Sequence, residues 1–591
     1  MAETIVGSAG LQDPARNRPI PHVPFAAWLV PCCYLAAALV LTWRLWADPA
    51  SRAQVVAANG ISHDVDLFAW FVWYAATAVA HGHLPALVTT TLNAPRGINL
   101  MWNTSLLLPG VVLAPVTLLA GPQVSLTVLL VLAFAGSAAS LFVVLRRWGA
   151  SISAAALGGA LYGFSPALRM EAGGHYQLVF VVLPPLIVDA LLRIVTCRGH
   201  AVRGGIWLGL LVAAQVFTSE EILVQTVVAA VIIVAVLAAS QPQIVPGRIK
   251  QAVTGVGSAA VMALLVCGYP LWMQFHGPLA EHGSPWKVTD FKNRLANFVT
   301  PPGGVLFHSR VFANALARHP VAAGEYVAYL GWPLLAVLLT ATVCFWRDRR
   351  VRVAAVTFWL LEIFSLGGVA IKAGGLHYPA ALLPWYYLQH LPLLSQMLPN
   401  RFSLLADGAA AAVLALSLDL TRAAVRTDWQ RRVAAAGAIL AVLPVLPLPF
   451  QAARIEPVPA GWTAAFTRLR LTQADDVLVV PSNQAMMRWQ ADTNVPGSLV
   501  GGRCIVPSPA GKAESCREAE TATSTYLTDL WKGRKGLRAP SRTEVRANLA
   551  HMRLTAIVVV TRRGSRLDHA SIRLFGPPTF QIGTVLAWRT G

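Results

Sequence analysis

Charge is the scarcest feature of this sequence. Charged residues make up 13% of its 591 residues, whereas hydrophobic residues make up 55% and the mean hydropathy is +0.56. A water-soluble globule of this size needs more charge to cover its surface. The shortage excludes a soluble protein and predicts a chain that crosses a lipid bilayer many times.

Acidic residues are scarcer than basic ones, with 27 Asp and Glu against 47 Lys and Arg and a net charge of +20. Such an excess can indicate nucleic-acid binding, but here the basic residues stand in short clusters between apolar segments. Clusters of this kind report topology, because cytoplasmic loops of membrane proteins are enriched in Lys and Arg. We therefore predict no nucleic-acid partner.

Several motifs are also absent. The sequence contains no GxxxxGK, GxSxG or HExxH, so ATP-driven transport and serine hydrolysis lose support. Its 7 cysteines show no spacing that resembles a zinc site. The first apolar segment, 25–46, is too long for a signal-peptide core and lacks a persuasive cleavage site, which predicts a retained first helix.

Apolar segments that reach or approach membrane-spanning length predict a polytopic α-helical fold of about 11 transmembrane helices. They lie near 25–46, 123–145, 152–168, 176–195, 204–219, 221–240, 251–272, 328–345, 352–368, 402–420 and 432–450. A further run, 106–121, is short and broken by proline. It is either another span or a re-entrant element.

The basic clusters decide between these alternatives. If 106–121 does not span and the N-terminus is inside, every cluster lies in a cytoplasmic loop. Counting 106–121 as a span would place the same clusters outside. We therefore predict a cytoplasmic tail at 1–24, a transmembrane module at 25–450 and a first outer loop at 47–122. The clusters are Arg146 with Arg147, 193–203, 247–250, 346–352 and 421–432.

The last part of the chain, 451–591, predicts a small extracytoplasmic α/β domain. Buried strands are expected at 475–481 and 554–560, an amphipathic helix at 542–552, and a terminal strand or hairpin at 580–590. Cys504 and Cys516 both lie in this outer domain, where a disulfide would persist, so we predict that they pair.

Two acids near the start of the first outer loop are the leading catalytic candidates. Asp64 and Asp66 precede the aromatic run LFAWFVWYAATAVA, which is typical of a helix at the lipid–water interface. A carboxylate there could meet both a water-soluble acceptor and a lipid head group. The alternative is that the acids only stabilise the start of the helix.

Further candidates for binding a phosphate or sugar lie on the same predicted face. Each has a plain alternative as a turn, loop or anchoring residue, although two adjacent acids within an apolar stretch favour a polar pocket. The candidates are Arg96, Asn99 and Asn103 in 92–105, Arg169 and His175 in 164–177, the pair Glu220 and Glu221, and Arg401.

Several stretches, taken in order, resemble a known family. They are D..LFAW..W at 64–73, LNAPRGINLMWNTS at 92–105, GFSP and GGH within 163–175, TSEE at 218–221, EYVAYLGWPLL at 325–335, FSLGG at 364–368 and LPLLSQMLPNRFSLL at 391–405. Together they resemble a bacterial, actinobacteria-like group of multi-spanning GT-C glycosyltransferases of the cell envelope. The stretch 477–502 is similar to the C-terminal domain of that group.

The resemblance implies a helical membrane module with an acid in its first outer loop and a polyprenyl-phosphate-linked sugar donor. The family acid falls on Asp64, and Asp66 is close enough to compete. Transfer from such a donor needs a base for the acceptor hydroxyl and cations beside the phosphate, but no general acid. We therefore predict an inverting glycosyltransferase that acts on an envelope glycan or glycolipid at the outer face of the bacterial plasma membrane.

Other expectations stay open at this point. No cofactor is required, although the two aspartates could bind a divalent cation. A transporter or flippase for lipid-linked sugars is one alternative function, but it would favour internal repeats, which the sequence does not show. A non-catalytic protein that binds lipid-linked glycans is another.

Overall fold

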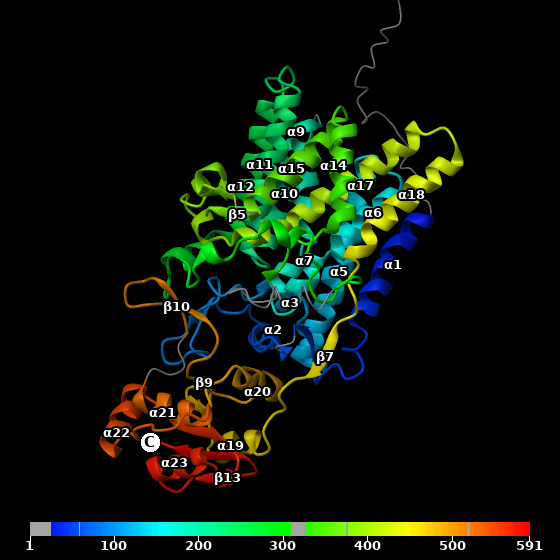
Figure 1. The fold of residues 1–591 in the computed structure, drawn as a ribbon. Coiled ribbons are helices and arrows are strands. Elements are labelled where there is room, and N and C mark those ends of the chain that lie inside the picture. Colours follow the sequence, from blue (N-terminus) through cyan, green and yellow to red (C-terminus); the bar gives the residue numbers. More distant parts are fainter. Residues whose placement is uncertain are drawn as a thin grey trace, which may run out of the picture.

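The computed structural model describes residues 25–57, 60–197, 199–308, 325–373, 376–516 and 521–590. The predicted tail at 1–24 lies outside these residues, as do residues 309–324. Figure 1 shows a tall helical body, coloured blue to yellow, with a smaller α/β body in orange and red at its lower end.

The longer helices of the upper body correspond to the apolar segments of the sequence. They are α1 (Phe25–Thr42), α5 (Pro122–Arg147), α6 (Ile152–Gly163), α9 (Leu183–Thr196), α10 (Ala201–Val216), α11 (Glu220–Ser240), α12 (Ile249–His276), α14 (Gly331–Cys344), α15 (Arg349–Ser365), α17 (Ser403–Ala424) and α18 (Asp428–Val442).

Within the described residues, 5 helices are long and apolar enough to cross a membrane by length and composition. They are Ala27–Trp46, Pro122–Arg147, Glu220–Ser240, Ile249–His276 and Pro399–Ala424. Two more apolar helices, α10 and α14, are shorter. This body is that of a multi-pass membrane protein, and the total of 11 spans stays a prediction.

Two expected spans are interrupted, which corrects their predicted bounds. The segment 176–195 divides into α8 (Tyr176–Val179) and α9, because Pro184 and Pro185 occupy the first turn of α9, where a missing N–H costs nothing. The segment 152–168 ends as α6 at Gly163. A new short helix, α7 (Pro166–Glu171), follows it.

The aromatic helix after the first span is α2 (Asp64–Ala80), and its aromatic residues face protein rather than lipid. The indole nitrogens of Trp70 and Trp73 donate to Gln490 Oε1 at 2.9 Å and to Asn494 Oδ1 at 3.0 Å. These partners belong to α20 (Ala485–Thr493) and its C-terminal cap, in the lower body. The expected interfacial helix is therefore the helix on which the two bodies meet.

The run 106–121 forms two short helices, α3 (Leu107–Val112) and α4 (Ala114–Ala120), which pack against α2. Neither is long enough to cross a bilayer. Gly110 allows this close packing, because a Cβ built there would lie 2.8 Å from the Cβ of Ala75 in α2.

The lower body contains a five-stranded sheet in the order β13-β14-β12-β8-β9. Parallel pairing joins β8 (Asp476–Val480) to β9 (Ser498–Leu499) and to β12 (Ala556–Val560), whereas β14 (Val585–Arg589) runs antiparallel to β12 and to β13 (Phe580–Ile582). The helices of this body are α19 (Trp462–Arg468), α20, α21 (Ala522–Trp531), α22 (Arg542–His551) and α23 (Arg566–Phe575). Strands β8 and β12 are buried along most of their length, as expected for 475–481 and 554–560.

Short strands join the two bodies. Strand β7 (Gln451–Arg454) follows α18, the last helix of the upper body, and pairs with β1 (Arg52–Ala57) of the first outer loop. Strand β1 also pairs with β2 (Gly60–Ile61). The remaining two-stranded ribbons are β3 (Val88–Thr89) with β4 (Ile98–Asn99), β5 (Ile371–Ala373) with β6 (Leu376–Tyr378), and β10 (Ile505–Pro507) with β11 (Ala513–Ser515).

Candidate active site

A cavity of about 480 Å³ lies between the helical body and the β10-β11 hairpin. Its wall combines segments that are far apart in the sequence: the start of α2, the loop 100–107, the turn between α10 and α11, the end of α12, and the hairpin itself. Of the predicted site residues, the wall contains Asp64, Asn103, His175, Glu220, Glu221 and Arg401.

Asp64 starts α2 and is half-buried in this wall. Its Oδ1 accepts a hydrogen bond from Arg503 Nε, and its Oδ2 accepts one from the Ser62 hydroxyl at 3.3 Å. His175 Nε2 lies 3.7 Å from Oδ2. Gly174 permits this approach, because a Cβ built there would lie 2.6 Å from Ser62 Oγ.

Asp66 lies only two residues further but is not in the cavity wall. Its Oδ1 accepts from Arg488 Nε at 2.5 Å, and Arg488 is fully buried and also donates to the backbone oxygen of Val65. Asp66 therefore joins α2 to α20. Because its carboxylate compensates a buried charge outside the cavity, the geometry favours Asp64 over Asp66 as the catalytic candidate.

Arg401 lies in the short turn Pro399–Phe402, just before α17, among three carboxylates. Its guanidinium contacts Glu325 at 2.5 Å, Glu221 at 2.7 Å and Glu171 at 3.8 Å. Asn400 donates a further hydrogen bond to Glu325 at 2.9 Å. The charge of Arg401 is thus compensated within the protein, so the expected direct phosphate contact is not what this geometry favours.

His175 connects Asp64 to this group of carboxylates. Its Nδ1 lies 2.5 Å from Glu171 Oε2 and 4.0 Å from Glu325 Oε1. Burial opposes its protonation, but the two carboxylates outweigh burial and raise the pKa of His175 to about 9. Burial would also raise the pKa of Glu325, but Arg401 outweighs it and lowers that pKa to about 2. At neutral pH, His175 is a cation in the cavity wall.

Besides Asp66, three further predicted residues lie outside the cavity wall. Arg96 is exposed at a turn. The amide of Asn99 donates to the backbone oxygens of Met273 and Pro278 at 3.0 and 3.2 Å. Arg169 is buried with its guanidinium 3.8 Å from the centre of the Phe450 ring. The predicted sugar or phosphate contacts of these three residues therefore stay predictions.

The cavity wall also contains acids whose roles differ. Glu220 accepts a hydrogen bond from Gln274 at 2.8 Å, whereas Glu221 pairs with Arg401. Glu281 has both carboxylate oxygens buried without a hydrogen-bond partner in the structure. Burial raises the pKa of Glu281 to about 8, so its carboxyl group is mostly protonated at neutral pH.

Sequence reasoning missed three residues of this site. Glu325 stands at the start of the quoted stretch EYVAYLGWPLL, which was a usable signal. Arg503 immediately precedes Cys504, so it lies beside the predicted disulfide. That position does not indicate that its side chain reaches Asp64. Glu281 lies in a long loop without a motif, and nothing in its local sequence indicates burial.

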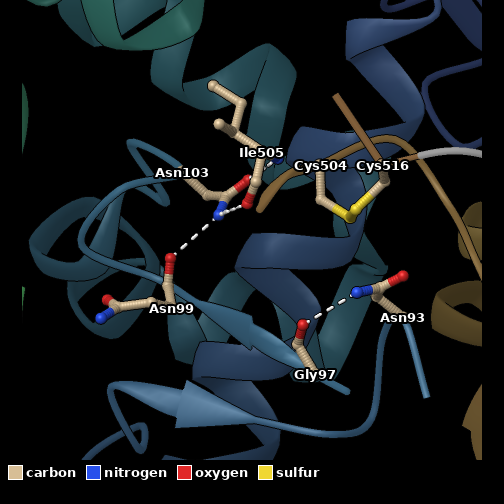
Figure 2. The surroundings of a disulfide bond; sticks show 7 residues. All are labelled: Asn93, Gly97, Asn99, Asn103, Cys504, Ile505 and Cys516. Atoms are coloured by element: carbon tan, nitrogen blue, oxygen red, sulfur yellow. Dashed lines mark hydrogen bonds between the residues drawn. A yellow bond between two sulfur atoms is a disulfide. The ribbon is translucent and has the colours of Figure 1, made fainter. Parts of the chain in front are cut away.

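The β10-β11 hairpin carries Arg503 and is fastened at two points. A disulfide joins Cys504 to Cys516 across its base. Asn103 donates to the backbone oxygen of Ile505 at 2.9 Å and accepts from its backbone nitrogen at 2.7 Å. Figure 2 shows the disulfide beside the loop that contains Asn103. Asn103 therefore holds the hairpin, and its expected ligand contact stays a prediction.

Glu171, His175 and Glu325 each offer one ligand atom, and these atoms lie within 4.8 Å of one another. Carboxylate oxygens and an imidazole nitrogen suit a divalent cation. Arg401 lies against both carboxylates, however, and already supplies positive charge there. The residues present can hold a cation, but their charge balance does not require one.

No protein-family model and no curated protein matches the sequence. Similar solved structures include the mycobacterial arabinofuranosyltransferase AftD, with a TM-score of 0.54 and 13% identity over 96% of this chain and 40% of that one. The Archaeoglobus fulgidus oligosaccharyltransferase AglB, in complex with an inhibitory peptide and a dolichol-phosphate, gives 0.44 and 10% over 91% and 69%. ArnT from Cupriavidus metallidurans, bound to undecaprenyl phosphate, gives 0.35 and 10% over 95% and 98%.

The likeness to AftD concerns the fold, since the identity is low and this chain spans 40% of that protein. The other two similarities are too weak to support an argument. The chain thus shares a helical fold with AftD, and its own apolar helices are those of a multi-pass membrane protein.

Proposed function

We propose that the protein is an inverting glycosyltransferase that moves a sugar from a polyprenyl-phosphate donor to a glycan or glycolipid of the bacterial cell envelope. The supporting observation is the surroundings of Asp64 in the cavity wall. Its Oδ1 is held by Arg503, and His175 Nε2 lies 3.7 Å from its Oδ2. A carboxylate and two cations are the groups that this reaction needs.

In the proposed reaction, Asp64 Oδ2 accepts the proton of the acceptor hydroxyl. The hydroxyl oxygen then forms a bond to the anomeric carbon as the bond from that carbon to the phosphate oxygen breaks. The electron pair stays on the phosphate, which leaves as polyprenyl phosphate. Attack opposite the leaving group inverts the anomeric centre.

Positive charge beside the phosphate stabilises the charge that develops on the leaving oxygen. His175 and Arg503 fill this role in the proposal, because both line the cavity next to Asp64. Arg401 acts as a positioning residue: it holds Glu325 and Glu221, and Glu325 helps to keep His175 protonated. The leaving group is a phosphate monoester that is stable as an anion, so it needs no general acid.

We also propose that the cavity opens on the extracytoplasmic side, because all the basic clusters of the sequence then lie in cytoplasmic loops. The lower body, 451–591, is on the same side as the cavity and supplies Arg503. We propose no essential metal, since Arg401 compensates two of the three groups that could bind one. A divalent cation, if bound, would be held by Glu171, His175 and Glu325.

The test is sugar transfer in membranes that contain the full chain, from radiolabelled polyprenyl-phosphate sugars to endogenous acceptors. Asp64→Asn should lower product formation by at least about 100-fold, the usual contribution of a general base. Asp66→Asn should lower the amount of folded protein, because a buried Arg488 loses its partner. Asp290→Asn, in an exposed outer position, is the matched control and should transfer normally.

Normal products from Asp64→Asn at normal protein levels would overturn the proposal. If the radiolabelled donor moves across the membrane and no glycan product forms, the result would instead favour the flippase alternative. Repeating the wild-type assay with a chelator tests whether transfer needs a metal. If the chelator abolishes transfer and a divalent cation restores it, the proposal that no metal is essential is wrong.

A further inference from the structure

A second cavity, of about 280 Å³, lies among α5, α6, α9, α11, α15 and α17. Along α11 its wall extends from Thr226 to Leu237, which is about 16 Å at 1.5 Å per residue. At the far end, Trp148, Arg349 and Arg350 line it. None of its lining residues lines the candidate active site.

The wall between these ends offers an occupant no free hydroxyl group. The hydroxyl groups of Thr226, Thr357 and Thr196 donate to the backbone oxygens of the residues four positions earlier in their own helices. The Tyr162 hydroxyl donates to the backbone oxygen of Val181 at 2.9 Å. Such a wall suits a hydrocarbon chain, because an apolar occupant leaves no polar group unpaired.

The end with the arginines carries excess positive charge. Arg350 pairs with Asp348 at 3.2 Å and donates to the backbone oxygen of Trp148. Arg349 donates to the side-chain oxygen of Gln241, and no carboxylate of the described residues forms an ion pair with it. Both arginines are exposed at the basic end of the helices, where an anionic group could reach them.

We propose that this groove binds a glycerophospholipid with an anionic head group. One acyl chain lies between α11 and its neighbours, and the phosphate meets Arg349 and Arg350. Trp148 lies at the same level, where indole rings favour the boundary between hydrocarbon and head groups. Basic pockets between transmembrane helices on the cytoplasmic side are suited to anionic lipid head groups. The site is independent of the proposed transfer reaction.

The test uses the purified, delipidated full chain and two lipid probes with identical acyl chains, phosphatidylglycerol and phosphatidylcholine. Native mass spectrometry should show tighter binding of phosphatidylglycerol, and thermal unfolding should shift upward only with that lipid. Soluble glycerol 3-phosphate should give no shift, because the head group alone cannot fill the groove. Equal binding of the two lipids would overturn the proposal.

Variants assign the site. The double variant Arg349→Gln/Arg350→Gln should weaken phosphatidylglycerol binding by about fivefold for each arginine. Arg426→Gln/Arg432→Gln removes the same charge from two exposed positions elsewhere, one just before α18 and one within it, and should bind normally. Ala229→Phe places a large side chain in the cavity at α11 and should reduce binding of the acyl chain of either lipid. Equal losses of phosphatidylglycerol binding in both double variants would mean that the lipid responds only to surface charge. Exclusive binding of polyprenyl phosphate would make this cavity a donor site. Either result would overturn the proposal.

Discussion

Asp64 and Asp66 differ in their neighbours because of simple helix geometry. Residues two positions apart in an α-helix do not face the same way. Asp64 therefore faces the cavity while Asp66 faces Arg488 of α20. The sequence could show that the two acids diverge, but not which of them faces the cavity, because that depends on where the lower body docks.

His175 links activity to pH. Its pKa of about 9 means that it is a cation below that pH and neutral above it. We expect transfer at low donor concentration to fall as the pH rises through 9, because attraction of the donor phosphate is lost. His175→Gln should be about tenfold slower at pH 7, comparable to the loss of one charge-assisted hydrogen bond.

Initial rates between pH 7 and 10 provide the measurement. The His175→Gln profile should lack the wild-type decline near pH 9. If wild type and variant decline in parallel, another group is responsible for the pH dependence.

Glu281 links stability to pH. In the unfolded chain it ionises near 4.5, but in the folded protein burial holds the proton up to about 8. Stability that is present below pH 4.5 is therefore lost progressively as the pH rises to 8, because only the unfolded state releases the proton readily.

Glu281→Gln should remove this loss. We expect the variant to melt at a higher temperature than wild type at pH 8, because its neutral amide has no proton to release on unfolding. At pH 4.5 the two should coincide. Asp290→Asn, an exposed acid of the same loop, should change neither melting temperature, and an equal gain at both pH values would contradict this account.

Among the elements, the β10-β11 hairpin matters most for the site, because it carries Arg503 to Asp64. The disulfide closes a short loop, with a sequence separation of 12. Closing a loop of about 15 residues removes about 3 kcal/mol of chain entropy from the open state. The hairpin is thus held in place by covalent closure and by the two hydrogen bonds of Asn103.

Reduction of Cys504–Cys516 should loosen the hairpin and lower transfer by about tenfold, comparable to the loss of one charge-assisted contact to Asp64. Cysteines outside this pair are first alkylated, so that the reductant acts only on the disulfide. Cys504→Ser/Cys516→Ser should show the lower rate and no response to reductant. A wild-type rate that is unchanged by complete reduction would show that Asn103 alone is sufficient.

For the whole molecule, the proposed orientation can be tested with a membrane-impermeant maleimide on intact cells. The background is a protein in which serine replaces the five free cysteines, Cys32, Cys33, Cys197, Cys267 and Cys344. Each of two variants of it then carries one new cysteine. Asp290→Cys should be labelled, because its loop is extracytoplasmic in the proposal. Arg426→Cys should be labelled only after permeabilisation, and labelling in intact cells would reverse the orientation.

The helices were largely predictable from sequence, because apolar runs and basic clusters depend on local composition. The breaks near Gly163 and before Pro184 were not, since proline at the start of a helix and proline inside a span have the same local sequence. The packing of Trp70 and Trp73 on α20 was also missed. Those contacts join residues more than 400 positions apart, and no local pattern encodes them.

The candidate site divides in the same way. Asp64, His175 and Arg401 stood in quoted motifs and lie in one cavity wall. Asn99 and Arg169 stood in similar motifs, but Asn99 donates to backbone oxygens and Arg169 lies against the Phe450 ring. A polar side chain in a loop can form its contacts either with the protein or with a ligand. Choosing between those uses requires knowing the neighbours in space.

Arg503 lies 439 residues after Asp64 in the chain. During synthesis, the carboxylate is therefore made long before its cationic partner. A nascent or truncated chain carries Asp64 without the hairpin that completes its surroundings. Assembly of this site is therefore a late event in synthesis, because it requires the segment that contains Arg503.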